Sequence, residues 1–325
     1  MKVLVTGAAG FIGRHLMRRL IDAGHETVAL ILQPETAAAL PAETSEVIVC
    51  DLAESSAAVA AAIPEGCDAA VHLAGRLGDW GVSETALLRA NLETTRCLLE
   101  ALPRRGIRKL LHASTPGVVG FSGVAAEDAP LAPRSPYERS KAEAERLVLA
   151  HGPELGIAVS VLRPDFVYGP GDLRRLGLLR AWKRGLFFYV AGGHSLIHPT
   201  FVGDVADAFV RVLDSSPEQT VINIAGPRPV TWRELAETGC ALLGVRPPRW
   251  SLPRPLARVA GRLCELLFPL IGREPPLTAN RIEFMSRDHA SKTERARELL
   301  GWQATTDLRT GLRQTIDWAR TEGHL

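Results

Sequence analysis

The sequence predicts an α/β protein built on a doubly wound parallel sheet, with a smaller substrate-binding region interleaved in its C-terminal half. Three observations predict this fold. A short apolar strand opens the chain and runs directly into a glycine-rich turn and a helix. Apolar runs of strand length then alternate with helical patterns to about residue 165, and the pattern becomes less regular after Gly171. Such alternation favours right-handed strand–helix–strand units, which form parallel sheets.

The expected strands of the first half are short apolar runs at 2–6, 26–32, 46–50, 68–73, 108–114 and 157–162. In the second half, segments at 187–190, 199–202 and 220–224 mix with helices near 203–214 and 231–243. Thr231 and Glu234 are spaced as a capping box that opens the latter helix. We expect a nucleotide-binding unit over 1–170 and a mainly substrate-binding region over 171–325, with some segments returning to the first unit.

The first strand, Lys2 to Thr6, leads into Gly7-Ala-Ala-Gly10-Phe-Ile-Gly13 and a helix that ends at Gly24. Glycines at this place allow a tight turn and let the N–H groups of a helix N-terminus approach a pyrophosphate. The motif therefore predicts dinucleotide binding through Gly7, Gly10, Phe11, Ile12 and Gly13. The alternative is a turn that only packs a helix on a sheet.

Tyr137 and Lys141 lie four residues apart, so they share one face of a helix. A nearby fixed cation favours the phenolate of a tyrosine, whose ordinary pKa is near 10. We therefore expect Lys141 to lower the pKa of Tyr137 and suit it to proton transfer. By itself, a pair of this spacing is also an ordinary exposed contact.

Local signals bound the helix that carries this pair. Ser135 is the expected N-cap, Pro136 suits the first helical position, and Glu138 completes a capping box. Gly152-Pro153 is expected to end the helix.

Together, Thr6-Gly-Ala-Ala-Gly-Phe-Ile-Gly13 and Tyr137-x-x-x-Lys141 resemble the extended short-chain dehydrogenase/reductase superfamily (the NAD-dependent epimerase/dehydratase family) over nearly the whole chain. Further segments follow in the family's order: Asp68-Ala-Ala-Val-His-Leu-Ala74, Asn91-Leu-Glu-Thr-Thr, Ser114-Thr115 with Gly120, Arg163-Pro-Asp-Phe-Val-Tyr-Gly-Pro-Gly171 and Gly301-Trp302. The resemblance implies a Rossmann-type domain and hydride transfer between a nicotinamide and a secondary alcohol or ketone.

The resemblance also implies roles for four residues. Tyr137 would be the acid/base, with Lys141 as its activator and a ribose contact. Thr115 would bind the substrate oxygen, with Ser114 as the alternative, because strand alternation lets only one of the two face the site. Asn91 would support a proton-relay water, although its side chain could instead only kink or cap its helix.

Cofactor contacts are implied by the same resemblance. Asp51 and Leu52 would meet the adenine, although an aspartate here could simply close a strand. The remaining expected contacts are Leu73, Ala74 and Gly75 after the fourth strand, and Pro164 and Val167 along the nicotinamide. The second strand ends Ile31-Leu32-Gln33, with neither the acid that favours NAD nor the arginine that favours NADP. The cofactor is therefore NAD or NADP, and Arg14 is either a phosphate contact or a solvated residue.

The substrate side departs from the nucleotide-sugar members of the family. Ile197 stands where they usually carry an arginine that grips a diphosphate, and Phe166 replaces their asparagine before Val-Tyr-Gly-Pro. We expect a largely apolar, sterol-like or acyl substrate, flanked by Trp80, Trp182, Phe187, Phe188 and Tyr189.

Residues 254–271 have the apolar spacing of an amphipathic helix. With Pro275-Pro276-Leu277-Thr278, this segment resembles the 3β-hydroxysteroid-dehydrogenase-like branch. Its apolar positions are Leu256, Val259, Ala260, Leu263, Leu266, Leu267 and Leu270. Core packing, a lid and a peripheral membrane contact are the alternatives for it.

Composition excludes several other classes. The chain has 325 residues, 46% of them hydrophobic, and a net charge of +2 with basic and acidic residues interleaved. This pattern argues against a nucleic-acid partner. The five cysteines are scattered, which predicts no metal site and a cytoplasmic protein. His72, within an apolar strand, is expected to be a satisfied core histidine. No segment has the length and apolarity of a membrane span.

Two rivals remain at this level. One is a nucleotide-sugar epimerase or dehydratase that recycles its hydride. The other is a non-catalytic cofactor sensor, which the retained Tyr137 and Lys141 argue against. The family resemblance suggests a homodimer.

Overall fold

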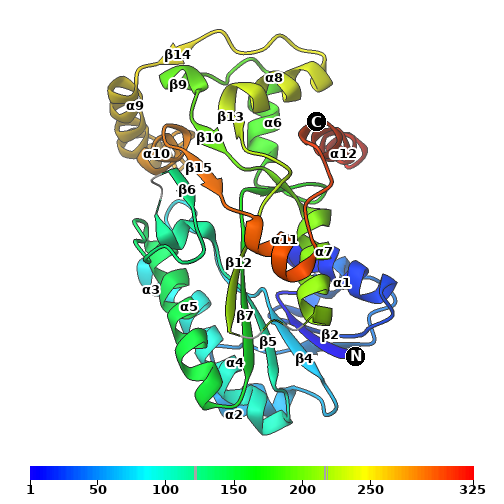
Figure 1. The fold of residues 1–325 in the computed structure, drawn as a ribbon. Coiled ribbons are helices and arrows are strands. Elements are labelled where there is room, and N and C mark those ends of the chain that lie inside the picture. The colour runs from blue at the N-terminus through cyan, green and yellow to red at the C-terminus, as the bar shows by residue number, and fades with distance from the viewer. Residues whose placement is uncertain (121–122, 216, 218) are drawn as a thin grey trace.

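The computed structural model describes residues 1–120, 123–215, 217 and 219–325, and a seven-stranded sheet forms its centre (Figure 1). The strand order is β12-β7-β5-β4-β1-β2-β3, and every adjacent pair is parallel. The strands are β1 (Lys2–Thr6), β2 (Glu26–Ile31), β3 (Glu46–Val49), β4 (Ala69–His72), β5 (Lys109–Ala113), β7 (Ala158–Pro164) and β12 (Thr220–Ile224). The strands expected from the sequence are confirmed to within about two residues at each end.

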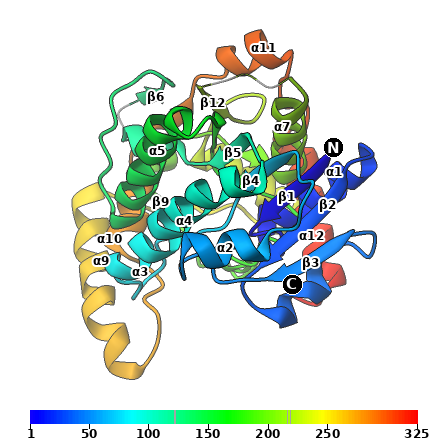
Figure 2. The same cartoon turned by 90° about the horizontal axis from the view of Figure 1, so that it is seen from below.

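Helices cover both faces of this sheet (Figure 2). One face carries α1 (Phe11–Asp22), α7 (Val202–Ser215) and α11 (Glu294–Leu300). The other carries α2 (Ser56–Ala62), α4 (Thr94–Ala101) and α5 (Pro136–Glu154), with α3 (Glu84–Leu88) beside α5. Each layer has its own buried apolar cluster, so both sheet faces are sealed. The predicted doubly wound Rossmann-type fold is confirmed.

The strand order reverses between β1 and β4. From β1 the chain adds β2 and β3 on one side, then crosses over to add β4, β5 and β7 on the other. In open sheets of this kind, ligands bind at the carboxyl ends of the strands that flank such a reversal. The fold therefore places the glycine-rich turn and the end of β4 at the expected binding edge.

The second half of the chain builds a further apolar cluster from α6 (Leu176–Lys183), α8 (Trp232–Leu243) and α12 (Leu308–Thr321). Short strand pairs join its segments: β9 (Tyr189–Val190) with β14 (Ser251–Leu252), and β10 (Leu196–Ile197) with β13 (Val230–Thr231). At its border, β8 (Val167–Tyr168) pairs with β11 (Thr200–Phe201), and β6 (Gly123–Ala125) pairs with β15 (His289–Ser291). Because α7, α11 and β12 lie on the main sheet, the two halves interleave; the division near residue 170 stays a prediction.

The remaining elements are short helical turns and one outlying helix pair. The short 3₁₀ segments are η1 (Pro34–Ala39), η3 (Leu102–Arg105), η4 (Pro116–Val119), η5 (Ala191–Gly193) and η6 (Phe268–Ile271), and η2 (Arg89–Glu93) is a π-helical turn. The helix pair α9 (Arg254–Leu267) and α10 (Ala279–Met285) lies at the left of Figure 1, away from the main sheet. Among the described residues, every helix is too short or too polar to cross a membrane.

One predicted helix boundary and one predicted capping box are wrong. The helix expected to end at Gly152-Pro153 continues to Glu154, because the turn that ends it uses Gly156 at φ +68°. The N–H of Ile157 donates to the Gly152 carbonyl and that of Gly156 to Pro153, as in a Schellman ending.

The second correction concerns the start of α8. The Thr231 hydroxyl accepts from the Glu234 N–H at 3.0 Å, as a cap should. The Glu234 carboxylate, however, binds Arg228 instead of completing a capping box.

Candidate active site

The glycine-rich turn packs tightly against the end of β4. Gly7 has φ +67°, and a Cβ there would lie 2.7 Å from the Ala74 nitrogen. A Cβ at Gly13 would lie 2.2 Å from the Gly7 carbonyl oxygen. These glycines therefore allow close backbone packing, which is the role that the alternative interpretation gave them. They bring the turn against the segment Leu73 to Gly75.

The same turn also has the character of a dinucleotide cradle. Gly10 is the N-cap of α1, no side chain among the described residues caps this helix end, and its first turn has no acidic residue. The first N–H groups of a helix have no partner within the helix, so they suit a pyrophosphate. The Arg14 guanidinium donates to the Gly171 carbonyl at 3.2 Å, which ties α1 to the loop after β8. The residues present thus fit the predicted cofactor.

His72 links β1 to the π-helical turn through a directed chain of hydrogen bonds. Because the Thr95 hydroxyl donates to the Asn91 carbonyl at 2.6 Å, it must accept from His72 Nε2 at 2.9 Å. His72 Nδ1 therefore accepts from the Thr6 hydroxyl at 2.7 Å. Burial lowers the pKa of His72 to about 3, with the nearby charge of Lys141 as a lesser cause. The prediction that His72 is a satisfied core histidine is confirmed.

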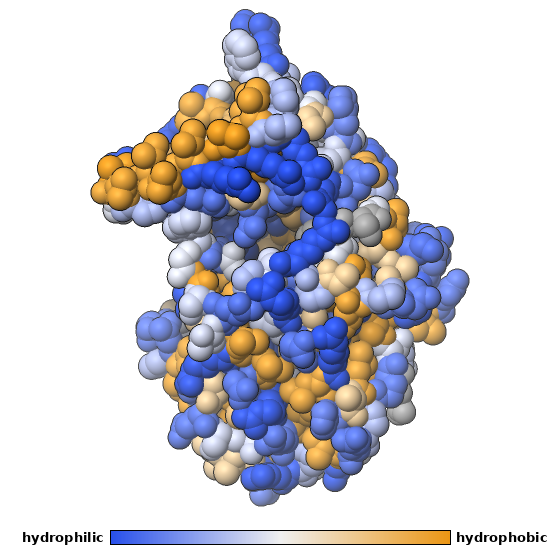
Figure 3. All heavy atoms as spheres, turned by 90° about the vertical axis from the view of Figure 1, so that its left-hand side faces the viewer, coloured by the Kyte–Doolittle hydropathy of each residue, from blue (hydrophilic) through white to orange (hydrophobic). Residues whose placement is uncertain are grey.

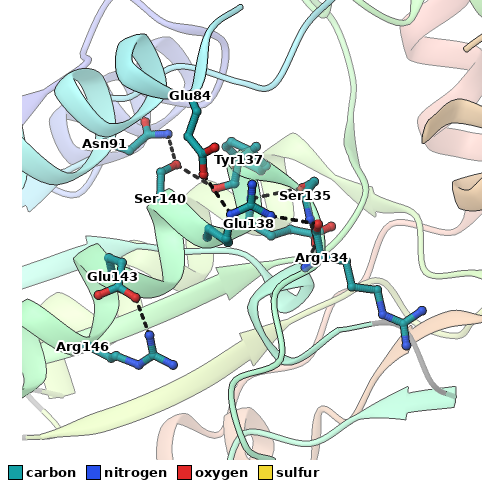
Figure 4. A network of polar contacts seen from close by, with 10 residues as sticks. Glu84, Asn91, Arg134, Ser135, Tyr137, Glu138, Ser140, Glu143 and Arg146 are labelled. Atoms are coloured by element: carbon teal, nitrogen blue, oxygen red, sulfur yellow. Dashed lines mark hydrogen bonds and ion pairs between the residues drawn. The ribbon is translucent and has the colours of Figure 1, made fainter. Parts of the chain in front are cut away.

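Asn91 lies within the π-helical turn and holds the loop that follows β4. The Arg76 N–H donates to Asn91 Oδ1 at 2.7 Å, and Asn91 Nδ2 donates to the Arg76 carbonyl at 3.0 Å and to Ser140 Oγ at 2.8 Å. Ser140 Oγ in turn donates to the Tyr137 carbonyl at 2.8 Å (Figure 4). The alternative role considered for Asn91 fits this geometry, because the residue sits where the helix departs from α geometry. Its side chain also joins the β4 loop to α5, and the relay role stays a prediction.

Tyr137 occupies the first turn of α5, where the predicted capping box is confirmed. The Ser135 hydroxyl accepts from the Glu138 N–H at 3.2 Å, and the Glu138 carboxylate accepts from the Ser135 N–H at 2.9 Å (Figure 4). A Cβ at Gly78 would lie 2.8 Å from the Cβ of Tyr137, so the β4 loop passes directly over this tyrosine. Tyr137 is thereby held against the loop that follows β4, the same loop whose start packs on the glycine-rich turn.

The expected lowering of the Tyr137 pKa by Lys141 is wrong. Burial raises the pKa of Tyr137 to about 12, and the cation that opposes this rise is Arg174. The Lys141 ammonium points into the protein and donates to the Ala113 carbonyl at 2.5 Å. Burial lowers the pKa of Lys141 itself to about 8. Desolvation therefore outweighs charge attraction at both members of the pair.

The structure distinguishes Ser114 from Thr115. Ser114 donates to Glu145 Oε2 at 2.6 Å inside a buried network in which Arg163 Nε also donates to Glu145, at 3.1 Å. Thr115 begins η4, where its hydroxyl accepts from the Gly117 N–H at 3.3 Å. A threonine hydroxyl that accepts one bond keeps its own proton to donate. Thr115 thus has the local capping role considered for it and still retains a donor for a substrate oxygen.

At the adenine end, the Asp51 carboxylate accepts from the Ala53 N–H at 2.9 Å and from Arg89 at 2.7 Å. Leu52 is only 4% exposed within the apolar core, so a cofactor could reach only its backbone. After β2, Leu32 is 64% exposed and Gln33 is exposed beside it. The residues after β2 therefore present neither an acidic nor a basic side chain to the ribose of the cofactor. The preference between NAD and NADP stays open.

Of the predicted nicotinamide contacts, Pro164 ends β7 and is buried, whereas Val167 on β8 is partly buried. Between them, Phe166 has φ +28°, a conformation that bulky residues rarely adopt and that is often found at functional sites. Its ring stacks on Phe284, meets Trp232 edge-on, and lies 3.7 Å from the Arg175 guanidinium carbon. An apolar aromatic group thus stands where nucleotide-sugar enzymes carry asparagine.

Several aromatic residues expected beside the substrate lie elsewhere. Trp182 and Tyr189 are each 1% exposed in the core of the second half, where Trp182 packs against Gly239. Phe187 and Phe188 pack with these buried clusters. Only Trp80, which is 42% exposed in the β4 loop, remains available. The sequence alone does not show whether an aromatic side chain fills the core or lines the substrate site.

Sequence reasoning missed the ion pair between Arg174 and Asp79. The guanidinium lies 2.5 Å from the carboxylate, and both side chains are about half exposed, at 53% and 52%. Asp79 follows Gly78, which contacts Tyr137. The pair joins the loops after β4 and β8, and only their meeting in space reveals it. Among the described residues, no cluster of acidic, histidine or cysteine side chains could hold a metal.

Comparisons with known proteins identify relatives that match nearly the whole chain. The chain is 30% identical over 331 residues to the 2-alkyl-3-oxoalkanoate reductase of Stenotrophomonas maltophilia, covering 97% of this chain and 98% of that protein. It is 27% identical to the decarboxylating sterol-4-alpha-carboxylate 3-dehydrogenase of Candida albicans, covering 97% of each chain. The solved structure of MoeE5 in complex with UDP-glucuronic acid and NAD is 30% identical, with a TM-score of 0.78, and covers 99% of this chain and 100% of its own.

The model of the NAD dependent epimerase/dehydratase family matches residues 3–225. That span contains the glycine-rich turn, the Asn91 turn, Tyr137 and Lys141. The protein belongs to the NAD-dependent epimerase/dehydratase family, the extended short-chain dehydrogenase/reductases that its motifs resemble.

Proposed function

We propose that this protein interconverts a secondary alcohol and a ketone on a largely apolar substrate, with NAD or NADP as hydride carrier. The observation that carries this proposal is the position of Tyr137. Its side chain begins directly against Gly78 of the β4 loop, and the first residues of that loop also pack against the glycine turn. Two relatives whose names describe a reductase and a dehydrogenase align over nearly the whole chain.

When bound, the nicotinamide supplies or accepts the hydride. Tyr137 donates its phenolic proton to the carbonyl oxygen during reduction and recovers it during oxidation. With a pKa raised to about 12, the phenol is protonated at neutral pH, which is the state that reduction requires. The Thr115 hydroxyl donates to the same oxygen. Asn91 and Ser140 hold the start of α5 against the β4 loop, which keeps the phenol in place.

We assign Arg174 to an anionic group of the substrate. The names 2-alkyl-3-oxoalkanoate and sterol-4-alpha-carboxylate both describe apolar molecules with a carboxylate on the carbon next to the reacting position. Arg174 is the cation whose charge acts on Tyr137, and its present partner Asp79 is half exposed. A substrate carboxylate could take the place of Asp79 in this pair, because guanidinium and carboxylate groups match in geometry.

The rival is a nucleotide-sugar epimerase or dehydratase, and the likeness to a structure holding UDP-glucuronic acid favours it. Two positions argue against it. Ile197, at the place of the diphosphate-binding arginine, is fully buried in the apolar core, and Phe166 replaces asparagine within an aromatic cluster. A buried diphosphate without cationic partners would be costly.

The test follows nicotinamide absorbance with NADH and NADPH against 2-alkyl-3-oxoalkanoates, sterol ketones and UDP-hexoses, with products analysed by mass and chromatography. Net oxidation of the cofactor on an apolar ketone supports the proposal. A changed hexose without net cofactor turnover would replace it with the epimerase function.

The Arg174 assignment has its own readout. Arg174→Ala should raise the KM for an oxo-acid roughly 10- to 100-fold, because a hydrogen bond to a charged group is lost. The KM for a matched ketone without the carboxylate should not change. Arg184→Ala, at an exposed arginine on the end of α6, is the control. An equal effect on both substrates would exclude carboxylate binding by Arg174.

A further inference from the structure

The most exposed apolar surface of the described residues lies on α9 and η6. Seven large side chains form this surface, here called the leucine face, and each is between 51% and 77% exposed: Leu256, Val259, Leu263, Leu266, Leu267, Leu270 and Ile271. In Figure 3 a ridge of hydrophobic side chains projects from the upper part of the molecule at the place of α9, bordered by hydrophilic atoms. Trp250, just before β14, is 81% exposed. A group of neighbouring apolar side chains that are exposed to this degree often marks an interaction site.

The other two faces of α9 already hold the helix to the protein. Its small residues pack on α10: a Cβ at Gly261 would lie 2.6 Å from Ile282 Cδ1, and Ala257 is fully buried. On the polar face, Arg254 donates to Glu283 at 2.8 Å and Arg258 binds the same carboxylate. Because these two faces dock the helix, the leucine face is not required by the fold of this chain. The core alternative for residues 254–271 therefore does not account for the leucine face.

The charges around the leucine face are unbalanced. Arg262 lies on α9 next to this face, Arg273 follows η6, and Arg249 precedes Trp250; all three are exposed, and no acidic side chain pairs with them among the described residues. The neighbouring acids are engaged. Glu265 accepts from the Ala279 N–H at 2.9 Å, Glu274 lies 2.9 Å from Arg281, and Glu283 binds its own arginines. The surface therefore combines a broad apolar strip with unpaired positive charge.

The apolar strip and the unpaired positive charge together indicate which kind of partner binds the leucine face. A second copy of this chain on a two-fold axis would face the patch with an identical one, which carries the same excess of positive charge. An anionic lipid surface satisfies both properties, because leucine and tryptophan side chains enter the boundary of the acyl chains while arginines bind the headgroups.

We propose that α9 and η6 form a peripheral docking surface for an anionic lipid bilayer, with the helix lying in the plane of the interface. The proposal does not depend on the reaction. It does have a consequence for the site, because α10, on which α9 packs, carries the Phe284 ring that stacks on Phe166. Docking would therefore turn the aromatic side of the site toward the membrane.

The test is co-sedimentation of the full chain with vesicles. The intact protein should pellet with phosphatidylglycerol/phosphatidylcholine vesicles and much less with phosphatidylcholine alone. The Leu263→Gln/Leu266→Gln variant should lower the partition coefficient at least about tenfold, because apolar area drives insertion. Arg262→Gln should lower it roughly fivefold on anionic vesicles only. Leu299→Gln, at a leucine on α11 that is 48% exposed, is the matched control and should bind as the intact protein does.

Two outcomes would overturn the proposal. One is a lack of vesicle binding, or binding that Leu263→Gln/Leu266→Gln leaves unchanged. The other is a dimer in sedimentation velocity that the same double variant splits into monomers, which would assign the leucine face to a second copy. Unfolding curves of each variant show whether it folds, so that lost binding is not mistaken for lost structure.

Discussion

Two helices of this protein reverse the usual distribution of polar and apolar residues. Helix α5 buries four polar residues, Glu138, Ser140, Lys141 and Glu145. Helix α9 exposes five large apolar residues and buries only Ala257 and Gly261. Both helices carry proline in their first turn, so their starts do not explain the difference. Buried polar groups and exposed apolar patches are the informative exceptions in a folded protein.

The difference shows that α5 supports the interior of the protein, whereas α9 presents a surface to other molecules. The buried polar residues of α5 are bonded to the Tyr137 carbonyl, the Ala113 carbonyl and Arg163, so they organise the proposed site. The apolar residues of α9 contribute little to the core, so they are available to a partner. Substitutions on α5 should therefore change activity and stability, whereas substitutions on the leucine face should change neither.

The largest effect is expected at Tyr137. Tyr137→Phe removes the proton donor and should lower kcat by roughly 100- to 10,000-fold, the usual contribution of general acid catalysis. Cofactor affinity, measured by fluorescence titration, should change little, because the phenyl ring keeps its packing against Gly78. Turnover equal to that of the intact enzyme would remove Tyr137 from the acid/base role.

The next largest effect is expected in the buried network of α5. Glu145→Ala leaves the Arg163 guanidinium buried without its carboxylate, and the two side chains are only 2% and 1% exposed. This should lower the free energy of unfolding by about 3–5 kcal/mol in denaturant titrations. Glu100→Ala, in an exposed pair with Arg96, should cost under about 1 kcal/mol. Equal costs for both variants would mean that the buried pair does not organise α5.

A pH effect of intermediate size is expected from Lys141. Its folded pKa is lowered to about 8 from 10.5, so between these values the unfolded chain binds more protons. The Lys141 contribution to stability should therefore rise with pH across this window, and the cost of burying the charge is fully present below it. Lys141→Met should remove this rise from the difference between the two stability–pH curves. Parallel curves for both proteins would show that Lys141 is not desolvated.

The smallest effect is expected on α9. Leu263→Gln should change the free energy of unfolding by less than about 0.5 kcal/mol, because its side chain is already 51% exposed. Val148→Ala, on the buried side of α5, should cost about 1–3 kcal/mol. A large loss of stability in Leu263→Gln would show that the leucine face is part of the core and would erase the contrast between the two helices.

Sequence reasoning predicted most of the fold and the frame of the site. The strands, the glycine turn and the Ser135 cap of α5 are local features, set by side-chain period, backbone freedom and contacts within a few residues. The same reasoning placed His72 in the core. It misplaced Trp182 and Tyr189, because aromatic side chains look alike in sequence whether they line a site or fill a core.

The sequence by itself determined that a doubly wound sheet carries a glycine turn at its first strand and brings Tyr137 and Lys141 to one helix face. Tertiary structure decided that Ser114 turns to Glu145, that burial raises the pKa of Tyr137, and that Arg174 joins the β4 loop. It also decided that the apolar strip of α9 faces outward. The reason is physical: helix period and turn chemistry act over a few residues, whereas desolvation and exposure depend on which distant segments pack together.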